Sequence, residues 1–272
     1  MVTALDRAYD VQIHQLRLRV SNFATRYWNS MGSWRDDDIE RLLEFVTPLI
    51  RSGQQRVSDL TDAYLSRVLV NQGGKPSGRP FQATTPALRG ITDEVLYARP
   101  FATMHESLGK GDTVTAAVAA GRARLTSLIM TNMQLAKTHA ARKTMTGAGA
   151  RAYERVPTGR ENCALCVIAS TQRYFVADLQ PIHPGCDCHV RPLTGDPAQH
   201  IIHPDRLEQI HRAVEGQFGE SDRGARYIDG RNAISDYLDL IAVRHHGEYG
   251  PTLSWRGEHF TGPDNLTRKD PT

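Results

Sequence analysis

The sequence predicts a mainly helical protein: long helices come first, a small α+β module follows, and a C-terminal tail is helical or irregular. Three observations support this fold class. Apolar residues recur at steps of three and four through most of residues 5–145. All four cysteines fall between residues 163 and 188, and glycine, proline and polar residues dominate from residue 247 onward. The 272 residues are enough for a large domain with a buried core.

The composition is that of an ordinary globular chain. Hydrophobic residues make up 40% of it and charged residues 23%, which excludes collagen, an extended disordered chain and a disulfide-dense toxin. No apolar stretch approaches the roughly 20 residues that a bilayer span needs. Asp6, Arg7 and Asp10 interrupt the N-terminal segment, where a signal peptide would need an apolar run. We therefore expect a cytoplasmic chain without a membrane partner.

An amphipathic helix is expected to begin near Leu5. Its apolar residues keep steps of three and four and therefore share one helical face. They are Leu5, Tyr9, Ile13, Leu16, Val20, Phe23 and Tyr27. Packing against the core is the favoured use of this face, and docking of a partner's helix is the alternative.

Shorter helical segments follow the first helix. Three acids from Asp36 suit the positive end of a helix, and Pro48 is expected to bend or end that helix. A third helix is expected over residues 57–70, followed by a glycine- and proline-rich loop over residues 71–80. Helical patterns return at residues 91–97 and 100–109.

The longest helix is expected from Thr113 to Met145, with Gly147 and Gly149 ending it. Residues 110–160 contain nine lysines and arginines against two acids, a local net charge of +7. Such a segment either binds phosphate or an acidic protein, or is a solvated helix face. His139, on the apolar side, is expected to be a hydrogen-bonded interior residue rather than a ligand.

The cysteines occur in two short motifs with the spacing of a metal site. The first is Cys163-x-x-Cys166, and after sixteen residues the second reads His183-Pro-Gly-Cys186-Asp-Cys188. A tetrahedral soft ion needs two such pairs, and thiolate and imidazole ligands favour zinc. The candidate metal ligands are Cys163, Cys166, His183, Cys186 and Cys188. The second pair of ligands is either Cys186 with Cys188, or His183 with one of these cysteines. Alternatively, His183 or His189 lies beside the ligands and supports them without binding the metal.

A structural zinc is the favoured interpretation of this cluster. Disulfides or metal-free thiols are one alternative, although a reducing cytoplasm disfavours disulfides. A catalytic metal is the other, but the local acids Glu161, Asp178 and Asp187 lie in none of the patterns that zinc hydrolases or deaminases use. A short helix after Cys166 and short strands at residues 173–176 and 190–193 would complete a small α+β module that the metal stabilises.

These observations divide the chain into four regions: an N-terminal helical region (1–110), the long basic helix (111–155), the Cys/His metal-binding module (156–200), and C-terminal helices with a tail (201–272). In the last region, one helix is expected from His203 to Phe218 and another around residues 234–242. The tail is expected to be disordered or to dock on a partner through Trp255 and Phe260.

Several strings of residues flank the cysteines. They are Tyr153–Pro157, Cys163-x-x-Cys166, Pro181–Cys188 and Arg191-Pro192, with Tyr97–Phe101, His246–Pro251 and Trp255–Gly257 further away. Together they resemble the MuF-like family of phage minor head proteins, or head morphogenesis proteins, in the form found in tailed phages of actinobacteria. The resemblance covers residues 91–260, and the Cys/His string is its specific part.

The resemblance implies a minor capsid protein that associates with the portal and enters the procapsid in few copies, so that it resides in the virion. The implied partners are the portal protein, the scaffold protein and the major capsid protein, and packaged DNA is a further candidate for the basic helix. Related genes are often labelled capsid maturation protease, so a protease that cleaves scaffold or capsid protein is the alternative function.

The sequence itself offers little to such a protease. No Gly-x-Ser-x-Gly motif is present, and Ser33, Ser170 and Ser221 lie in no recognisable nucleophile context. A cysteine nucleophile with His183 is conceivable, but four clustered thiols fit a metal better. A nucleic-acid-binding zinc module is a third hypothesis, and it lacks the expected aromatic residues and finger spacing.

Overall fold

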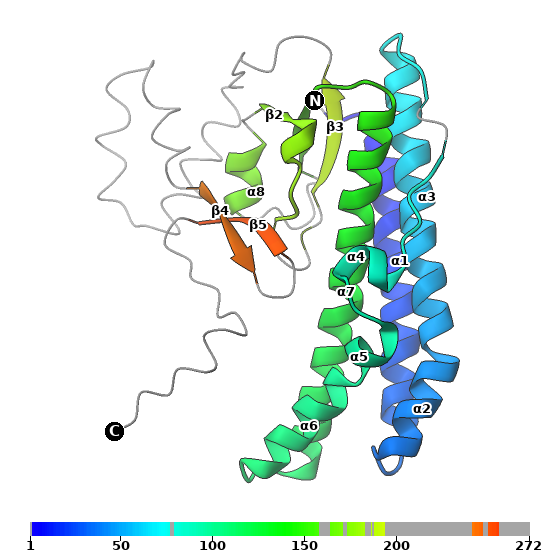
Figure 1. Cartoon of the computed structure of the whole chain (residues 1–272), viewed down its shortest axis with the longest axis vertical. Coiled ribbons are helices and arrows are strands. Elements are labelled where there is room, and N and C mark those ends of the chain that lie inside the picture. Colours follow the sequence, from blue (N-terminus) through cyan, green and yellow to red (C-terminus); the bar gives the residue numbers. More distant parts are fainter. Residues whose placement is uncertain are drawn as a thin grey trace, which may run out of the picture.

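Three long helices form the frame of the protein. The computed structural model describes residues 2–76, 79–157, 164–170, 173–182, 186, 188–193, 241–246 and 250–255. Helices α1 (Ala4–Ser30), α3 (Thr47–Asn71) and α7 (Val114–Gly147) pack against one another along their length (Figure 1). The prediction of a mainly helical protein is confirmed.

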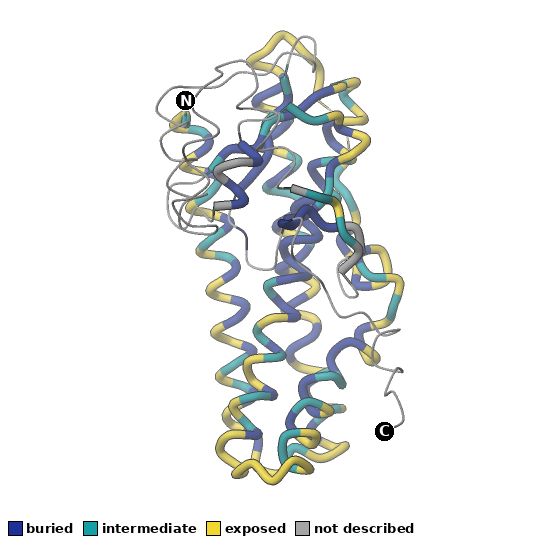
Figure 2. Tube along the Cα trace, turned by 90° about the vertical axis from the view of Figure 1, so that its left-hand side faces the viewer, coloured by how far each residue is buried: buried dark blue, intermediate teal, exposed yellow. Residues whose placement is uncertain are grey.

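The first helix buries much of the apolar face that the sequence predicts, although Phe23 of that face is exposed. Thr3 caps α1: its side chain accepts a hydrogen bond from the Asp6 backbone, and the Asp6 side chain accepts one from the Thr3 backbone. Tyr9, Ile13 and Val20 are buried in the main core. Buried positions alternate with exposed ones along the long helices in Figure 2, which is the pattern of helices with one face in a core.

Proline 48 separates two helices rather than bending one. Helix α2 (Asp36–Phe45) ends before it, and α3 begins at Thr47 with Pro48 in its first turn. Proline is tolerated there because a backbone N–H in the first turn has no acceptor within the helix. The third helix therefore starts ten residues earlier than the predicted residue 57, because Gly53, Gln54 and their neighbours are buried against other helices.

Short helices connect α3 to α7. They are α4 (Thr85–Arg89), α5 (Asp93–Tyr97) and α6 (Arg99–Gly109). Helix α6 packs closely on α7, and a Cβ added to Gly121 of α7 would lie 2.4 Å from the Trp28 ring and 2.9 Å from the Pro100 carbonyl oxygen. The glycine thus allows three segments to meet around the buried Trp28.

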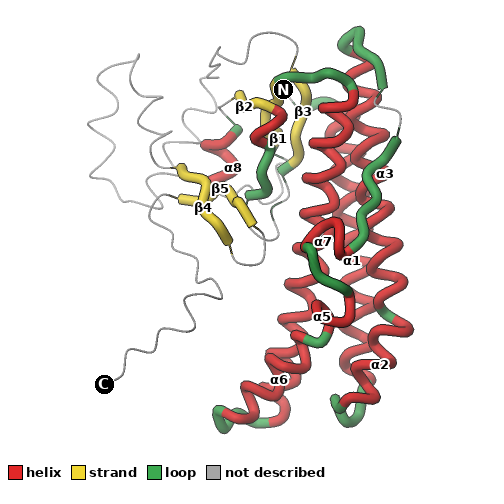
Figure 3. The backbone as a smooth tube through the Cα atoms, viewed as in Figure 1, coloured by secondary structure: helices red, strands yellow, loops and turns green. Residues whose placement is uncertain are grey.

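A three-stranded antiparallel sheet lies beside the bundle, with the strand order β2-β1-β3 (Figure 3). Its strands are β2 (Arg173–Phe175), β1 (Ala152–Val156) and β3 (His189–Leu193). Helix α8 (Ala164–Ala169) and the 3-10 turn η1 (Val176–Asp178) belong to the same module. The strands predicted at 173–176 and 190–193 are confirmed, the first of them ending at Phe175, whereas the central strand β1 has no counterpart among the predicted elements.

A β-hairpin occupies part of the predicted C-terminal helices and tail. Strand β4 (Ile241–His246) pairs antiparallel with β5 (Gly250–Trp255). The prediction that Ile241 and Ala242 continue a helix is therefore wrong, because both form ladder pairs with β5. The predicted helix from His203 to Phe218 lies outside the described residues. None of the described helices combines the length and apolarity needed to cross a membrane.

Candidate metal centre

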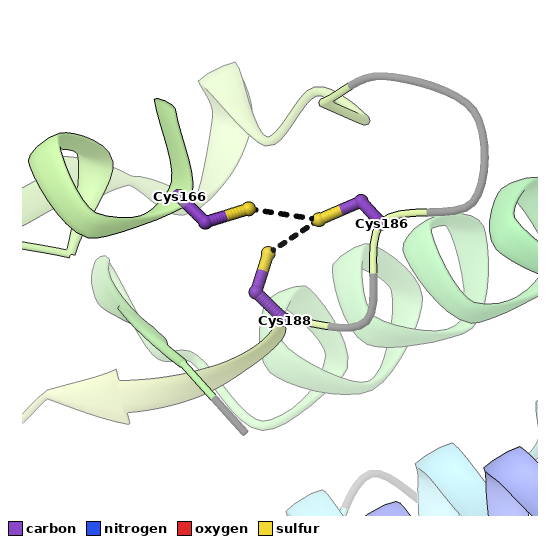
Figure 4. A group of neighbouring side chains, drawn as sticks. All are labelled: Cys166, Cys186 and Cys188. Atoms are coloured by element: carbon purple, nitrogen blue, oxygen red, sulfur yellow. Dashed lines mark hydrogen bonds between the residues drawn. The ribbon is translucent and has the colours of Figure 1, made fainter. Parts of the chain in front are cut away.

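Three thiols converge where helix α8 meets the entry to strand β3. Cys166 projects from α8, Cys186 precedes the strand, and Cys188 lies directly before its first residue (Figure 4). The Cys186 sulfur lies 3.1 Å from the sulfurs of both Cys166 and Cys188, and all three ligand atoms lie within 4.8 Å of one another. Each residue is at most 4% exposed. These three cysteines are free thiols, so no disulfide joins them.

The geometry of the three sulfurs suits a small tetrahedral ion. Zinc–sulfur bonds of about 2.3 Å place the sulfurs of a tetrahedral site about 3.8 Å apart. The observed separations of 3.1 Å therefore require only a small outward shift of the side chains. Three soft donors on one side also favour zinc over calcium or magnesium. The structure thus brings together three of the five candidate ligands; Cys163 and His183 lie outside the described residues.

Two buried cations lie against the cluster. Lys137 of α7 donates a hydrogen bond from Nζ to the Cys188 carbonyl oxygen at 2.8 Å. Arg155 of β1 donates from Nη2 to the Gln180 carbonyl oxygen at 2.5 Å, and its Nη1 lies 4.0 Å from the Cys188 sulfur. Lys137 is 6% and Arg155 4% exposed. Because buried cations are costly without compensating negative charge, their position indicates an anionic cluster.

The environment favours the thiolate form of Cys188. Hydrogen bonds from Cys166 and Cys186 hold the pKa of the Cys188 thiol well below its usual range, despite its complete burial. The positive charges of Arg155 and Lys137 lower that pKa further. A thiolate is the form that ligates metal.

The C-terminal hairpin closes the apolar side of the cluster. Leu253 and Trp255 of β5 are each 8% exposed and belong to the same buried group as Cys166 and Cys186. The Leu253 N–H also donates to the Pro181 carbonyl oxygen at 3.1 Å. Trp255, expected to anchor the tail on a partner, therefore packs within this chain, while Phe260 lies outside the described residues.

His189 faces the helical bundle. Its Nδ1 lies 2.8 Å from an Asp10 carboxylate oxygen, and its Nε2 lies 3.5 Å from an Asp6 oxygen. The rings of Tyr9 and Tyr64 pack edge-on against it. Burial lowers the pKa of His189, but the hydrogen bonds to both carboxylates outweigh that effect and raise it. His189 thus anchors β3 to α1, next to the thiols in the chain but bonded to other groups.

Further charges join the sheet to the first helix. Arg191 of β3 forms an ion pair with Glu154 of β1 and lies 3.3 Å from Asp6 of α1. Burial raises the pKa of Asp6, but hydrogen bonds from His189, Tyr64 and Thr3 outweigh it and hold that pKa well below its ordinary value. The module is therefore attached to the bundle through a buried network of opposite charges.

Most of these supporting residues were not predictable from the sequence. One signal was available for Lys137, because it is the only lysine, arginine or acid between residues 125 and 141; a single charge in such a helix requires a buried partner. Asp6 and Asp10 are spaced to share one helix face, but nothing local identifies a histidine 179 residues later as their partner.

The basic residues of α7 have separate environments. Lys137 points toward Cys188, Lys143 donates to the Pro80 carbonyl oxygen, and Arg122 is exposed. His139 is partly buried against the Phe81 ring, and its burial lowers its pKa to about 4. The excess charge in the sequence is therefore not one continuous surface.

The open space next to the cluster is small. A cavity of about 20 Å³ is lined by residues that include Tyr9, Gln134, Lys137, Cys188 and His189. Such a volume holds about one water molecule, so among the described residues this cavity beside Cys188 has no room for a substrate.

Comparison with known proteins identifies one family. The family described as VG15 protein matches residues 5–214, which include the three long helices, the three-stranded sheet and all four cysteines. Neither the search of curated proteins nor that of solved structures gave a match.

Proposed function

This chain belongs to the VG15 protein family, a family of phage proteins, and we propose that it is a minor capsid protein of the MuF-like type. In this proposal it acts at the portal and in the procapsid interior during head assembly, and it remains in the virion. One observation carries the proposal: three cysteines of the MuF-like string, Cys166, Cys186 and Cys188, converge on a buried cluster inside the region that the family covers.

The cluster is proposed to hold a structural zinc. Cys166, Cys186 and Cys188 would supply three ligands, and Cys163 or His183 the fourth. Bound zinc would supply a crosslink between α8 and the start of β3 and thereby contribute folding free energy to a small module. Lys137 and Arg155 would offset the negative charge of the thiolates. The small adjacent cavity supports a structural role.

Metal analysis tests the ligand set. The purified chain is expected to contain about one zinc, and a Cys188→Ser variant is expected to lose it or bind it much more weakly, since a thiolate ligand is removed. A Cys163→Ser variant is expected to do the same if Cys163 rather than His183 is the fourth ligand. A Ser33→Ala variant is a matched control, because the Ser33 hydroxyl donates to Asp38 at 2.8 Å in the turn before α2 and lies outside the cluster. Full zinc occupancy in both cysteine variants would refute the ligand set.

Assembly experiments test the role in the head. The chain is to be co-expressed with the portal, scaffold and major capsid proteins of its phage, and the procapsids separated by sedimentation. We expect the chain to sediment with procapsids in few copies and to be lost from procapsids made without portal. A chain that stays in the unassembled fraction under both conditions would contradict the proposal.

The same preparations distinguish the protease alternative. Mass analysis of scaffold and capsid proteins should show no cleavage that depends on this chain. Cleavage that disappears on replacing a single serine or cysteine would favour the protease instead. Packaged DNA is the remaining proposed partner, through the basic residues of α7; absence of salt-dependent retention on DNA at physiological ionic strength would reject it.

A further inference from the structure

A groove runs between helices α1 and α3, and the metal centre does not use it. Its volume is about 520 Å³, and every residue that lines it belongs to these two helices. Helix α7 packs on both of them but contributes no lining residue. The groove is therefore an outer face of the bundle.

The floor of the groove is apolar. Leu16, Val20 and Phe23 contribute from α1, and Leu49 contributes from α3. Phe23 and Leu49 are each 37% exposed, although both are large hydrophobic residues. Gly53 keeps the helices close at the middle of the groove, since a Cβ there would lie 2.8 Å from a Val20 methyl carbon. An apolar floor between two helices suits the apolar face of a further helix.

The rim of the groove is positively charged. Arg19 and Arg26 lie two turns apart on α1, and Arg56 lies on α3. All three are exposed, and in the described part of the chain none of them pairs with a carboxylate. No aspartate or glutamate is among the lining residues. Three uncompensated arginines around an apolar floor complement a ligand that is both acidic and apolar.

We propose that this groove binds an acidic amphipathic helix of a partner protein. The apolar face of the partner would cover Phe23 and Leu49, and carboxylates at its edges would reach the three arginines. Leu16 and Arg26 lie ten positions apart, or about 15 Å along the helix, so about three turns of partner helix would cover the segment between them. Nucleic acid is disfavoured because its phosphates would satisfy the arginines but leave the apolar floor uncovered. The inference does not depend on the proposed role in head assembly.

A binding measurement with the full chain tests this proposal. The probe is a fluorescent sixteen-residue helical peptide with leucines along one face and glutamates beside them, and binding is followed by fluorescence anisotropy. A peptide with lysines in place of the glutamates and a scrambled acidic peptide serve as controls. We expect saturable binding of the acidic amphipathic peptide only, with an affinity that falls as the salt concentration rises.

Charge-reversal variants locate the binding site. Replacing Arg19, Arg26 and Arg56 together by glutamate is expected to weaken binding at least ten-fold, and Phe23→Ser is expected to weaken it several-fold. These side chains are substantially exposed, so circular dichroism should show unchanged folding. Arg67→Glu is the matched control, because Arg67 is an exposed arginine of the same helix α3 outside the groove.

Several results would overturn the proposal. They are equal binding of the lysine peptide, undiminished binding by the triple variant, and equal loss with Arg67→Glu. Tight binding of duplex DNA that is lost in the triple variant, without peptide binding, would assign the arginines to nucleic acid instead. Self-association of the chain that the triple variant abolishes would assign the groove to a second copy. Each result leaves the assembly experiments unaffected and is therefore distinguishable from failure of the proposed head function.

Discussion

Replacing Lys137 by methionine tests whether the thiol cluster carries negative charge. The Lys137 ammonium is buried and donates to the Cys188 carbonyl oxygen at 2.8 Å. Methionine preserves most of the volume of the stem, so lost packing contributes little. The change therefore removes mainly a charge and a hydrogen bond next to the cluster.

The sign of the effect depends on the charge of the sulfurs. If Cys188 is a thiolate or a zinc ligand, the variant loses a hydrogen bond to a charged group and leaves negative charge uncompensated, at a cost of about 2–3 kcal/mol. If all three thiols are neutral, no thiolate compensates the ammonium, and its removal is expected to be neutral or stabilising. The structure supports the first case, because Arg155 is buried against the same sulfur.

Urea unfolding monitored by circular dichroism measures this difference. With a slope of about 2 kcal/mol per molar urea, the expected loss lowers the midpoint by about 1 M. Lys143→Met on the same helix is the control and should leave the midpoint unchanged, because Lys143 is exposed and donates to the Pro80 carbonyl oxygen, away from the thiols. A Lys137→Met midpoint equal to or above that of the parent chain would refute an anionic cluster.

Three further predictions concern the frame around the site. Gly121→Ala is expected to cost about 1–3 kcal/mol in a thermal or urea unfolding experiment because the new methyl overlaps the Trp28 ring, whereas Gly109→Ala, with open space around it, should be neutral or stabilising. Because the pKa of Asp6 is lowered in the folded state, the Asp6 carboxylate stabilises the fold above about pH 4, and this contribution is lost as the pH falls. Asp6→Asn should therefore lower Tm at pH 7 and make Tm fall less steeply as the pH is lowered below about 4. Trp255→Ala should open the hairpin, seen as faster amide exchange in β4 and β5 with α7 unchanged, and equal exchange in the parent chain would contradict the assigned packing.

The helical frame was predictable because its signals are local. The apolar period of α1 and the cap at Thr113 of α7 need no knowledge of distant residues. The predicted start of a helix was wrong where tertiary burial determines it. Helix α3 starts at Thr47, ten residues before the predicted helix. The short strand β1 was missed because its five residues acquire a strand signature only when paired with β2 and β3.

The sequence predicts which cysteines share a site, but not which other residues surround them. The spacing of Cys166, Cys186 and Cys188 indicated a shared site, and the structure brings these three together. The residues that surround them come from distant segments: Lys137 lies 51 positions from Cys188, and Trp255 lies further still along the chain. No periodicity encodes such a contact, since it depends on how the sheet packs against α7.

Two consecutive residues at the start of β3, Cys188 and His189, contact opposite sides of the sheet. Cys188 turns toward α8 and joins the thiols, while His189, the next residue, turns toward α1 and bonds to Asp10. Successive residues of an extended strand point to opposite faces, so one dipeptide attaches the sheet to both the metal module and the bundle. If the thiols hold the proposed zinc, its removal would take away one of these attachments and leave the other, and the bundle should stay folded in the zinc-free chain while the module loosens.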